Sequence, residues 1–314
     1  MAMSVARQAG GAATALPRRE AFDEHRRHFF WKMLGPVLVF LAVIFVLPVL
    51  YLTVTSLTPL TLTNPATSWN FSRPFGNYAL LLTDTRLHES LWTQAVLSFW
   101  TVGLQLLIGL GAALLVNGRP GSSDALRTVL IIPMVLPPIV VAIIWKVIYS
   151  PDISPLWWIF NHFGWVMPAP ITDARLALWS IIIADTWEWF PFTMLILLAA
   201  LKMMPGDWIE AAKVDGASRW QLFRFIILPY LRSALLVAGL FRLIDSIKAF
   251  PLIYILTEGG PGTATEVTNY YTFTQAFGFS YIGYSSAVTI VLVLIVGVLS
   301  FVVINLTEAR HDDD

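Results

Sequence analysis

The chain has 314 residues, of which 57% are hydrophobic and only 13% are charged, and its mean hydropathy is +0.69. This composition excludes an ordinary soluble domain. The formal net charge of zero says nothing about nucleic acid, but no basic stripe alternates with aromatic residues on a soluble element, so we expect no nucleic-acid partner. The absence of cysteine excludes disulfides, thiolate metal sites and a cysteine nucleophile.

Six apolar segments are long enough to span a bilayer. A hydrocarbon core about 30 Å thick requires about 20 helical residues, and these runs are continuous, as in helices, and not alternating, as in the strands of a β-barrel. They run approximately Leu34 to Leu57, Leu91 to Val116, Leu126 to Tyr149, Leu176 to Leu201, Ser233 to Leu256 and Ile282 to Leu306. The sequence therefore predicts an all-α integral membrane protein with six transmembrane helices, in contact with membrane lipid.

The distribution of Lys and Arg predicts the orientation of these helices. With the amino terminus in the cytoplasm, the cytoplasmic segments hold fourteen basic residues and the opposite loops hold only Arg73, Arg86 and Arg175. Cytoplasmic loops carry such an excess. We therefore expect cytoplasmic tails at residues 1–33 and 308–314, flanking a transmembrane domain at residues 34–307. The first apolar run is too long for a cleavable signal peptide, so we expect it to remain as a spanning helix.

A polar segment between the fourth and fifth spans is predicted to form a cytoplasmic helix over residues 207–221. Pro205 and Gly206 end the preceding span, Asp207 can cap the new helix, and Glu210 follows three residues later, as in a capping box. Such a helix either rests on lipid headgroups or docks as a rigid element in the cleft of a partner protein.

Charged residues inside the fourth and fifth spans form the candidate binding site. An ionised side chain that faces lipid at the bilayer centre costs at least about 2.5 kcal/mol, so these groups must face one another, water or a ligand. Two sets share helix faces: Asp185, Glu188, Trp189 and Phe192 on one span, and Arg242, Asp245, Ser246 and Ala249 on the next. An aromatic ring beside carboxylates and a guanidinium suits a sugar or a polyol.

Other interpretations of these charges remain open at this point. An interhelical ion-pair network, for instance Glu188 with Arg242 or Asp185 with Lys248, would merely order the bundle. An intramembrane enzyme would need a nucleophile or a metal, but the sequence contains no catalytic motif, and its five histidines are too scattered to predict a metal site. A passive channel or a scaffold would not need the capped cytoplasmic helix. Because the sequence predicts neither a catalytic motif nor a metal site, we expect a protein that is not an enzyme.

Several motifs carry a resemblance to a known family. Glu210-Ala-Ala is followed after three residues by Gly216 and after nine more by Ile226-x-Leu228-Pro229. This pattern resembles the signature loop of permease subunits of bacterial ABC importers, and Asp215, Ala217 and Phe223 make it similar to the carbohydrate branch, which includes the maltose-transporter permease family. Matching motifs elsewhere are Phe75-Gly-Asn77-Tyr78, Trp187 with Pro191-Phe192, Leu256-Thr-Glu-Gly-Gly-Pro261 and Gly283-Tyr-Ser-Ser-Ala287. Glu258 occupies a position at which the family commonly has a small or neutral residue.

The resemblance implies a type I ABC importer permease fold in the bacterial inner membrane. It implies a coupling helix that contacts the ATPase through Glu210, Ala211, Ala212, Asp215 and Gly216, where Glu210 makes an ion pair and Gly216 allows close approach and a bend. The implied partners are a second permease subunit, an external solute-binding protein and a dimeric ATPase, which binds ATP and Mg²⁺, so that this chain needs no cofactor of its own.

The sugar-contacting positions of the family correspond here to Glu188, Trp189, Phe192, Arg242, Asp245, Ser246 and Ala249. Several of these positions carry charges where the maltose permease family has neutral groups. The resemblance therefore supports the place of the site and leaves its substrate as a sugar, an oligosaccharide or a polyol. A phosphorylated polyol such as glycerol phosphate, with its phosphate on Arg242, is the alternative.

Overall fold

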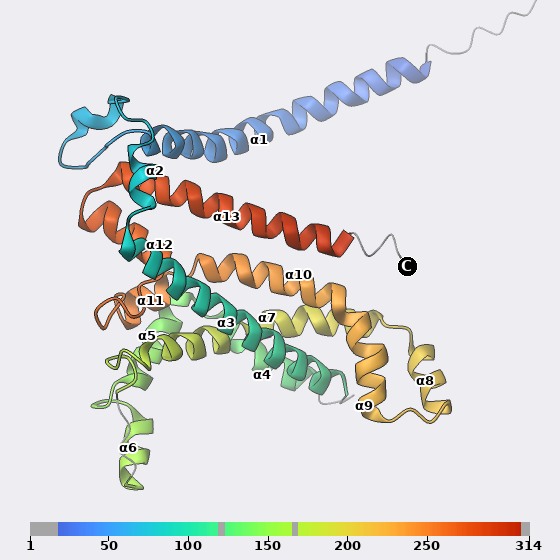
Figure 1. Ribbon diagram of the computed structural model, residues 1–314. Helices are drawn as coiled ribbons and strands as arrows, with labels where there is room; N and C mark the ends of the chain where they lie inside the picture. The colour runs from blue at the N-terminus through green and yellow to red at the C-terminus, as the bar shows by residue number, and fades with distance from the viewer. Residues whose placement is uncertain (1–17, 119–122, 165–168, 309–314) are drawn as a thin grey trace, which may run out of the picture. The chain divides into compact units, whose positions relative to one another are not determined.

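The computed structural model describes residues 18–118, 123–164 and 169–308. The chain divides into two compact units, Met1–Val54 and Thr55–Asp314. The ends of the predicted tails, residues 1–17 and 309–314, lie outside the described residues. The helices, of which Figure 1 labels the α-helices, are α1 (Arg18–Ser56), η1 (Pro65–Trp69), α2 (Gly76–Leu81), α3 (Thr85–Asn117), α4 (Ser123–Val135), α5 (Pro138–Tyr149), α6 (Pro155–His162), α7 (Ala177–Met203), α8 (Gly206–Val214), α9 (Arg219–Leu222), η2 (Phe223–Ile227), α10 (Leu228–Ile247), α11 (Pro251–Leu256), α12 (Thr268–Phe273), η3 (Thr274–Gly278) and α13 (Ile282–Glu308).

The all-α architecture is confirmed for the part of the chain that the structure describes, which contains helices and no β-strand. Five stretches are long and apolar enough to cross a membrane: Phe29–Ser56, Thr85–Asn117, Ala177–Met203, Arg219–Ile247 and Ile282–Val302. A sixth arises if α4 and α5, which meet at an angle of 94°, count as one broken span. The described residues thus hold five continuous candidate spans, or six if the bent pair is counted, and two of the predicted spans differ in form.

The third predicted span, Leu126 to Tyr149, is not a continuous helix. α4 ends at Val135 and α5 begins at Pro138, after the extended residue Pro137. Proline has no backbone N–H and disfavours the helical conformation of the residue before it, so two consecutive prolines interrupt the helix. The apolar composition predicted the length of this span but gave no indication of its bend.

The fifth predicted span, Ser233 to Leu256, is also broken. α10 ends at Ile247, and the short helix α11 begins at Pro251 after Phe250, which has φ −134° and ψ −49°. Pro251 causes this break, because it disfavours the helical conformation of Phe250 before it. At its other end this span starts earlier than predicted, because α9 and the π-helical turn η2 lead directly into α10.

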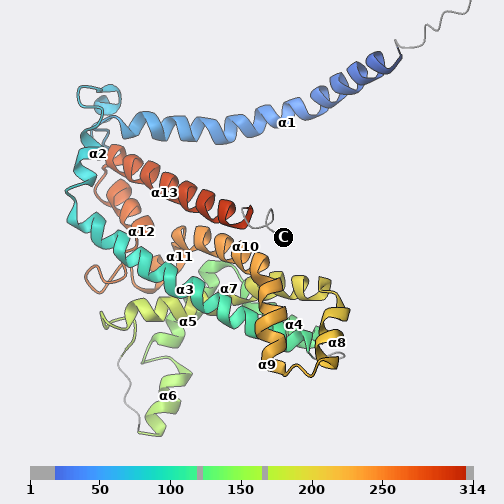
Figure 2. The same ribbon diagram turned by 45° about the vertical axis from the view of Figure 1, so that its right-hand side comes forward.

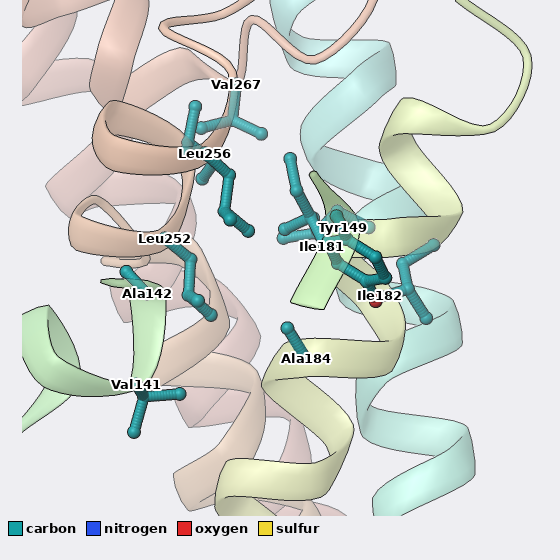
Figure 3. Packing of buried hydrophobic residues seen from close by; sticks show 11 residues of the cluster. Val141, Ala142, Tyr149, Ile181, Ile182, Ala184, Leu252, Leu256 and Val267 are labelled. Carbon is teal, nitrogen blue, oxygen red and sulfur yellow. The ribbon is translucent and has the colours of Figure 1, made fainter. Parts of the chain in front are cut away.

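The second unit is built around α3 and α7, which pack against each other more extensively than any other pair of helices. Gly109 lies at their contact, where an added Cβ would stand 2.7 Å from the side chain of Thr193. α10 packs against both helices, and α11 packs against α5. Side chains of α5, α7 and α11, among them Tyr149, Ile181 and Leu252, gather in a buried apolar cluster (Figure 3).

Long-range polar contacts tie the loops together near the beginning of α3. The Asp84 carboxylate accepts hydrogen bonds from the hydroxyls of Tyr271 and Tyr284 and from the backbone N–H of Leu87. Arg86 makes two hydrogen bonds, 2.7 and 2.8 Å long, to the buried carboxylate of Glu266. These contacts join the start of α3 to α12, α13 and the loop before α12.

Candidate functional site

A buried guanidinium lies where α3, α7 and α10 meet. Arg242 on α10 is only 1% exposed, although it is the largest of the fully buried side chains. One of its terminal nitrogens is 3.7 Å from Oδ2 of Asp185 on α7, and the other is 3.4 Å from Oδ2 of Asp245, one turn further along α10. Arg242 is thus paired with two carboxylates, of which Asp185 is buried and Asp245 is half exposed.

Gln105 on α3 bridges the two buried partners. Its side-chain oxygen accepts a 2.8 Å hydrogen bond from Nε of Arg242, and its amide nitrogen donates to Oδ2 of Asp185 at 2.8 Å and to the Asp185 carbonyl at 3.1 Å. An amide can perform this double role because it carries a donor and an acceptor on one rigid group. Gln105 therefore fixes the guanidinium and the carboxylate relative to each other.

An aromatic ring and a second carboxylate complete the cluster. The guanidinium carbon of Arg242 lies 4.6 Å from the ring centre of Trp189, within cation–π range. Glu188 is 1% exposed, and its Oε1 has no hydrogen-bond partner among the residues that the structure describes. A buried polar atom without a partner is uncommon in folded proteins, so this oxygen is an acceptor available to a ligand or to water.

Six of the eight predicted binding residues contribute to this arrangement, namely Asp185, Glu188, Trp189, Arg242, Asp245 and Ser246. Ser246 donates to Ser98 on α3 over 2.8 Å. Phe192 is half-buried and packs edge to face on Phe241, with ring centres 6.2 Å apart. Ala249 belongs to the apolar cluster around α11.

The ion pairs given as examples from the sequence are wrong in detail. Arg242 pairs with Asp185 and Asp245, and the described part of the chain has no ion pair between Glu188 and Arg242 or between Asp185 and Lys248. The reason is the register of the helices: α7 presents Asp185 to Arg242, whereas Lys248 is exposed just beyond the end of α10.

The sequence reasoning missed the contribution of α3. Gln94, Ser98, Thr101 and Gln105 are all buried and recur at intervals of four, three and four residues. This spacing places them on one helix face. Gln94 donates to the Ser246 carbonyl and to Ser98, so the polar face of α3 lies along α10. Polar residues at helical spacing in an apolar span were the signal that could have revealed it.

The polar segment between α7 and α10 forms two short helices, and not one helix over residues 207–221. α8 ends at Val214, and α9 begins at Arg219. Gly216 between them has φ +81°, a left-handed conformation that favours glycine, so the expected bend is present. In both views α8 and α9 lie at the end of α10 opposite α11 (Figures 1 and 2).

The predicted capping box at Asp207 is wrong as well. Pro205 occupies the N-cap of α8, no side chain caps this helix, and Asp207 lies in its first turn. The capping box is found one helix later, where Ser218 caps α9 and exchanges hydrogen bonds with Gln221. The helix begins at Gly206, two residues earlier than predicted, and Asp207 therefore lies inside its first turn and not at the cap.

The α8–α9 element presents its surface outward. None of the residues of α8 is buried, and Glu210, Ala211, Asp215 and Gly216 are exposed, while Ala212 is half-buried. Large apolar side chains are also exposed here, including Trp208, Val214 and Trp220. Exposed apolar groups beside charges are typical of a protein or membrane contact.

The comparisons with known proteins agree with this architecture. Residues 105–311 match the model of the family described as binding-protein-dependent transport system inner membrane component. The chain is 35% identical to the trehalose/maltose transport system permease protein MalF of Thermococcus litoralis, over 76% of this chain and 80% of that protein. It is 30% identical to the trehalose transport system permease protein SugA of Mycobacterium tuberculosis, over 74% of each chain.

A solved structure supports the same fold. The chain resembles a crystal structure of a bacterial ABC transporter involved in the import of the acidic polysaccharide alginate, with a TM-score of 0.78 and 19% identity, over 93% of this chain and 99% of that one. The match to the family model and the similarity to the two permeases extend over most of the chain. This multi-pass membrane protein therefore belongs to the family of binding-protein-dependent transport system inner membrane components.

Proposed function

We propose that this chain is one of two permease subunits of an ATP-driven importer for a sugar, an oligosaccharide or a polyol. Of two relatives that are at least 30% identical, one is named for trehalose/maltose transport and the other for trehalose transport, which supports the carbohydrate class. Membership in a family of transport components excludes the intramembrane enzyme that the carboxylates of Asp185, Glu188 and Asp245 left open.

The observation that carries the substrate class is the charge arrangement around Arg242. Its guanidinium already has Asp185 and Asp245 as partners, and Glu188 lies one turn further along α7 from Asp185. A phosphate group would add negative charge to a site that already holds three carboxylates. A neutral sugar instead offers hydroxyls to the carboxylates and a C–H face to Trp189. The site therefore suits a neutral carbohydrate better than a phosphorylated polyol.

The α8–α9 element is proposed to dock in a cleft of the ATPase, on the cytoplasmic side that the basic residues favour. Glu210 would pair there with a basic residue, and Gly216 would let the backbone approach closely. An exposed ion pair contributes only about 0 to 1 kcal/mol, so the exposed Trp208, Val214 and Trp220 should carry most of the contact. Closure of the ATP-binding dimer would then move the element and the attached spans as a rigid body.

The coupling role is tested in the complete assembly, reconstituted in proteoliposomes with its second permease, its ATPase and its binding protein. We expect Glu210→Lys and Gly216→Leu to abolish ATP-driven uptake of trehalose and maltose, and to reduce the amount of ATPase that copurifies with the membrane subunits. Glu89→Lys makes the same charge reversal at an exposed position near the start of α3, and it should leave copurification unchanged. Normal uptake in both α8–α9 variants would refute the coupling role.

The transport mode and the binding site have separate tests. Uptake that continues without ATP would indicate a passive channel.

Trp189→Ala should lower sugar uptake about tenfold, because one ring contact and the support of Arg242 are lost, whereas Trp92→Ala, at an exposed position on α3, should not. Equal effects of the two substitutions would contradict the assignment of the site.

A further inference from the structure

Beyond the end of α10 lies a group of aromatic side chains with no role in the proposed function so far. We name it the aromatic face, and its members are Phe250, Tyr254, Tyr270, Phe273 and Phe277. The ring of Phe250 is 5.3 Å from that of Tyr254, 6.1 Å from that of Tyr270 and 5.0 Å from that of Phe273. The ring of Phe277 lies 5.2 Å from that of Phe273 and extends the series.

The fold holds these rings in place from behind. α11 buries Leu252 and Leu256 among the side chains of α5 and α7 (Figure 3), and Ile253 belongs to the same buried cluster. Tyr254 is left on the side that meets α12. Tyr270 packs against Gly259, where an added Cβ would stand 2.8 Å from the ring. The rings are therefore fixed by packing, but Tyr254 is 46% exposed and Phe277 is 65% exposed.

The surroundings of the aromatic face are polar, which favours contact with water over contact with lipid. Asp245, Lys248 and Glu258 are exposed close to it along the chain. Asn269 on α12 donates to the carbonyl of Lys248 over 3.2 Å and so ties α12 to the end of α10. Charged side chains are more favourably placed in water than against lipid, so this surface fits a water-filled passage.

We infer that the aromatic face is a second carbohydrate subsite, next to the Arg242 site on the path of the substrate. From Arg242 to the end of α10 at Ile247 the helix rises only roughly 8 Å, and Phe250 follows after two residues. Fixed rings offer flat apolar surfaces to the C–H faces of sugar rings, and the two tyrosine hydroxyls offer hydrogen bonds to sugar hydroxyls. This inference rests on the proposed function.

The inference is tested with the complete assembly and with trehalose and maltose as probes. Equilibrium binding to the purified assembly without binding protein, and the maximal ATP-driven uptake rate, are measured for each variant. Tyr254→Ala and Phe277→Ala should each weaken binding and slow uptake roughly three- to tenfold, as expected for the loss of one ring contact. Tyr254→Phe keeps the ring and should stay within about twofold of the wild type in both measurements.

Phe279→Ala is the matched control. Phe279 is exposed to a similar extent and is only two residues from Phe277, but its ring contacts none of the five rings among the described residues. This variant should bind and transport like the wild type. Unchanged binding and uptake in Tyr254→Ala and Phe277→Ala, or an equal loss in Phe279→Ala, would overturn the inference.

The failure of the subsite is distinguishable from the failure of the proposed function. If the wild-type assembly carries trehalose or maltose and the aromatic variants do so equally well, only the subsite is refuted. If the wild-type assembly carries no member of a panel of sugars, oligosaccharides and polyols that includes trehalose and maltose, both ideas fail. If Tyr254→Ala loses the second permease subunit during purification, the aromatic face is a subunit interface, and the subsite is again refuted.

Discussion

Arg242 donates a hydrogen bond from Nε to the side-chain oxygen of Gln105 over 2.8 Å, and the two residues come from different helices with exposures of 1% and 0%. The same amide donates to Asp185. The positions of the Arg242 guanidinium and of the Asp185 carboxylate thus both depend on the neutral side chain of Gln105. A site built in this way holds a guanidinium without a direct, tight ion pair, since Arg242 and Asp185 are 3.7 Å apart.

The first prediction concerns this bridge. Gln105→Leu keeps the approximate size of the side chain but leaves Nε of Arg242 and the Asp185 carboxylate without their partner. We expect the variant to lose about 2 kcal/mol of stability, measured as a lower apparent Tm of the purified protein, together with sugar binding. Leu107→Ala, at an exposed position of the same helix, should change the apparent Tm little. A wild-type Tm and wild-type sugar binding in Gln105→Leu would show that the bridge has no such role.

The second prediction concerns Arg86 and Glu266. The Glu266 carboxylate is 3% exposed and depends on two hydrogen bonds from Arg86, whose side chain is 41% exposed. Arg86→Ala should therefore destabilise the protein by about 3 kcal/mol, because it leaves a buried charge unpaired. Arg86→Ala combined with Glu266→Gln should recover part of this loss in the same thermal measurement. Additive losses in the double variant would contradict the pairing.

The positions of the spans and the faces of the site could be predicted from the sequence because both depend on local spacing. Long apolar runs predicted α3, α7 and α13 to within about six residues at each end. The intervals of three and four residues placed Asp185 beside Glu188, and Arg242 beside Asp245, on their helix faces. Prolines determined the breaks before α5 and α11, and these residues were visible in the sequence although the breaks were not predicted.

Contacts between distant segments could not be predicted in this way. Gln105 and Arg242 are 137 positions apart, and Asp84 is 187 positions from Tyr271 and 200 from Tyr284. No local pattern encodes such pairs, since they depend on the register in which whole helices pack. The cap of α8 shows that local patterns also have a limit, because the helix starts two residues earlier than predicted and Asp207 lies in its first turn.

The third prediction is a pH dependence at Asp84. Partial burial alone would raise the pKa of this carboxyl, but hydrogen bonds from Tyr271, Tyr284 and the Leu87 backbone lower it below its ordinary value of 3.8. A carboxyl whose pKa is lower in the folded state stabilises the protein above its unfolded pKa, and this contribution is lost as the pH falls through the folded value. Asp84→Asn removes this pH-dependent contribution to the stability of the folded state.

The measurement is the difference in apparent Tm between the wild type and Asp84→Asn from pH 6 to pH 3. We expect the wild type to be more stable at pH 6 and the difference to shrink below pH 3.8. Asp152→Asn, at an exposed position in the loop after α5, should follow the wild-type curve throughout. A difference that stays constant over the whole range would contradict the assignment.

The fourth prediction concerns the contact between α3 and α7. A Cβ at Gly109 would lie 2.7 Å from the side chain of Thr193 and 3.0 Å from the backbone nitrogen of Met194, so the two helices would have to separate. Gly109→Ala should lower the free energy of unfolding by about 1 to 3 kcal/mol, measured by thermal denaturation. Gly111→Ala, two residues along, has no atom within 4 Å of its added Cβ and should be neutral or slightly stabilising. Equal effects of the two substitutions would show that the helices are not in close contact at Gly109.

The fifth prediction concerns Glu258, which precedes Gly259 in the loop after α11. Glu258 has φ +50°, in the left-handed region where a residue with a side chain is strained. Glu258→Gly should therefore raise the apparent Tm, with a gain of about 1 kcal/mol, because glycine adopts this conformation without strain. Thr263→Gly, at an exposed position in the same loop without positive φ, should instead lower it, because glycine only adds chain entropy to the unfolded state there. If Glu258→Gly destabilised the protein to the same extent as Thr263→Gly, the strain at Glu258 would be absent, and its side chain would have to stabilise the loop by another contact.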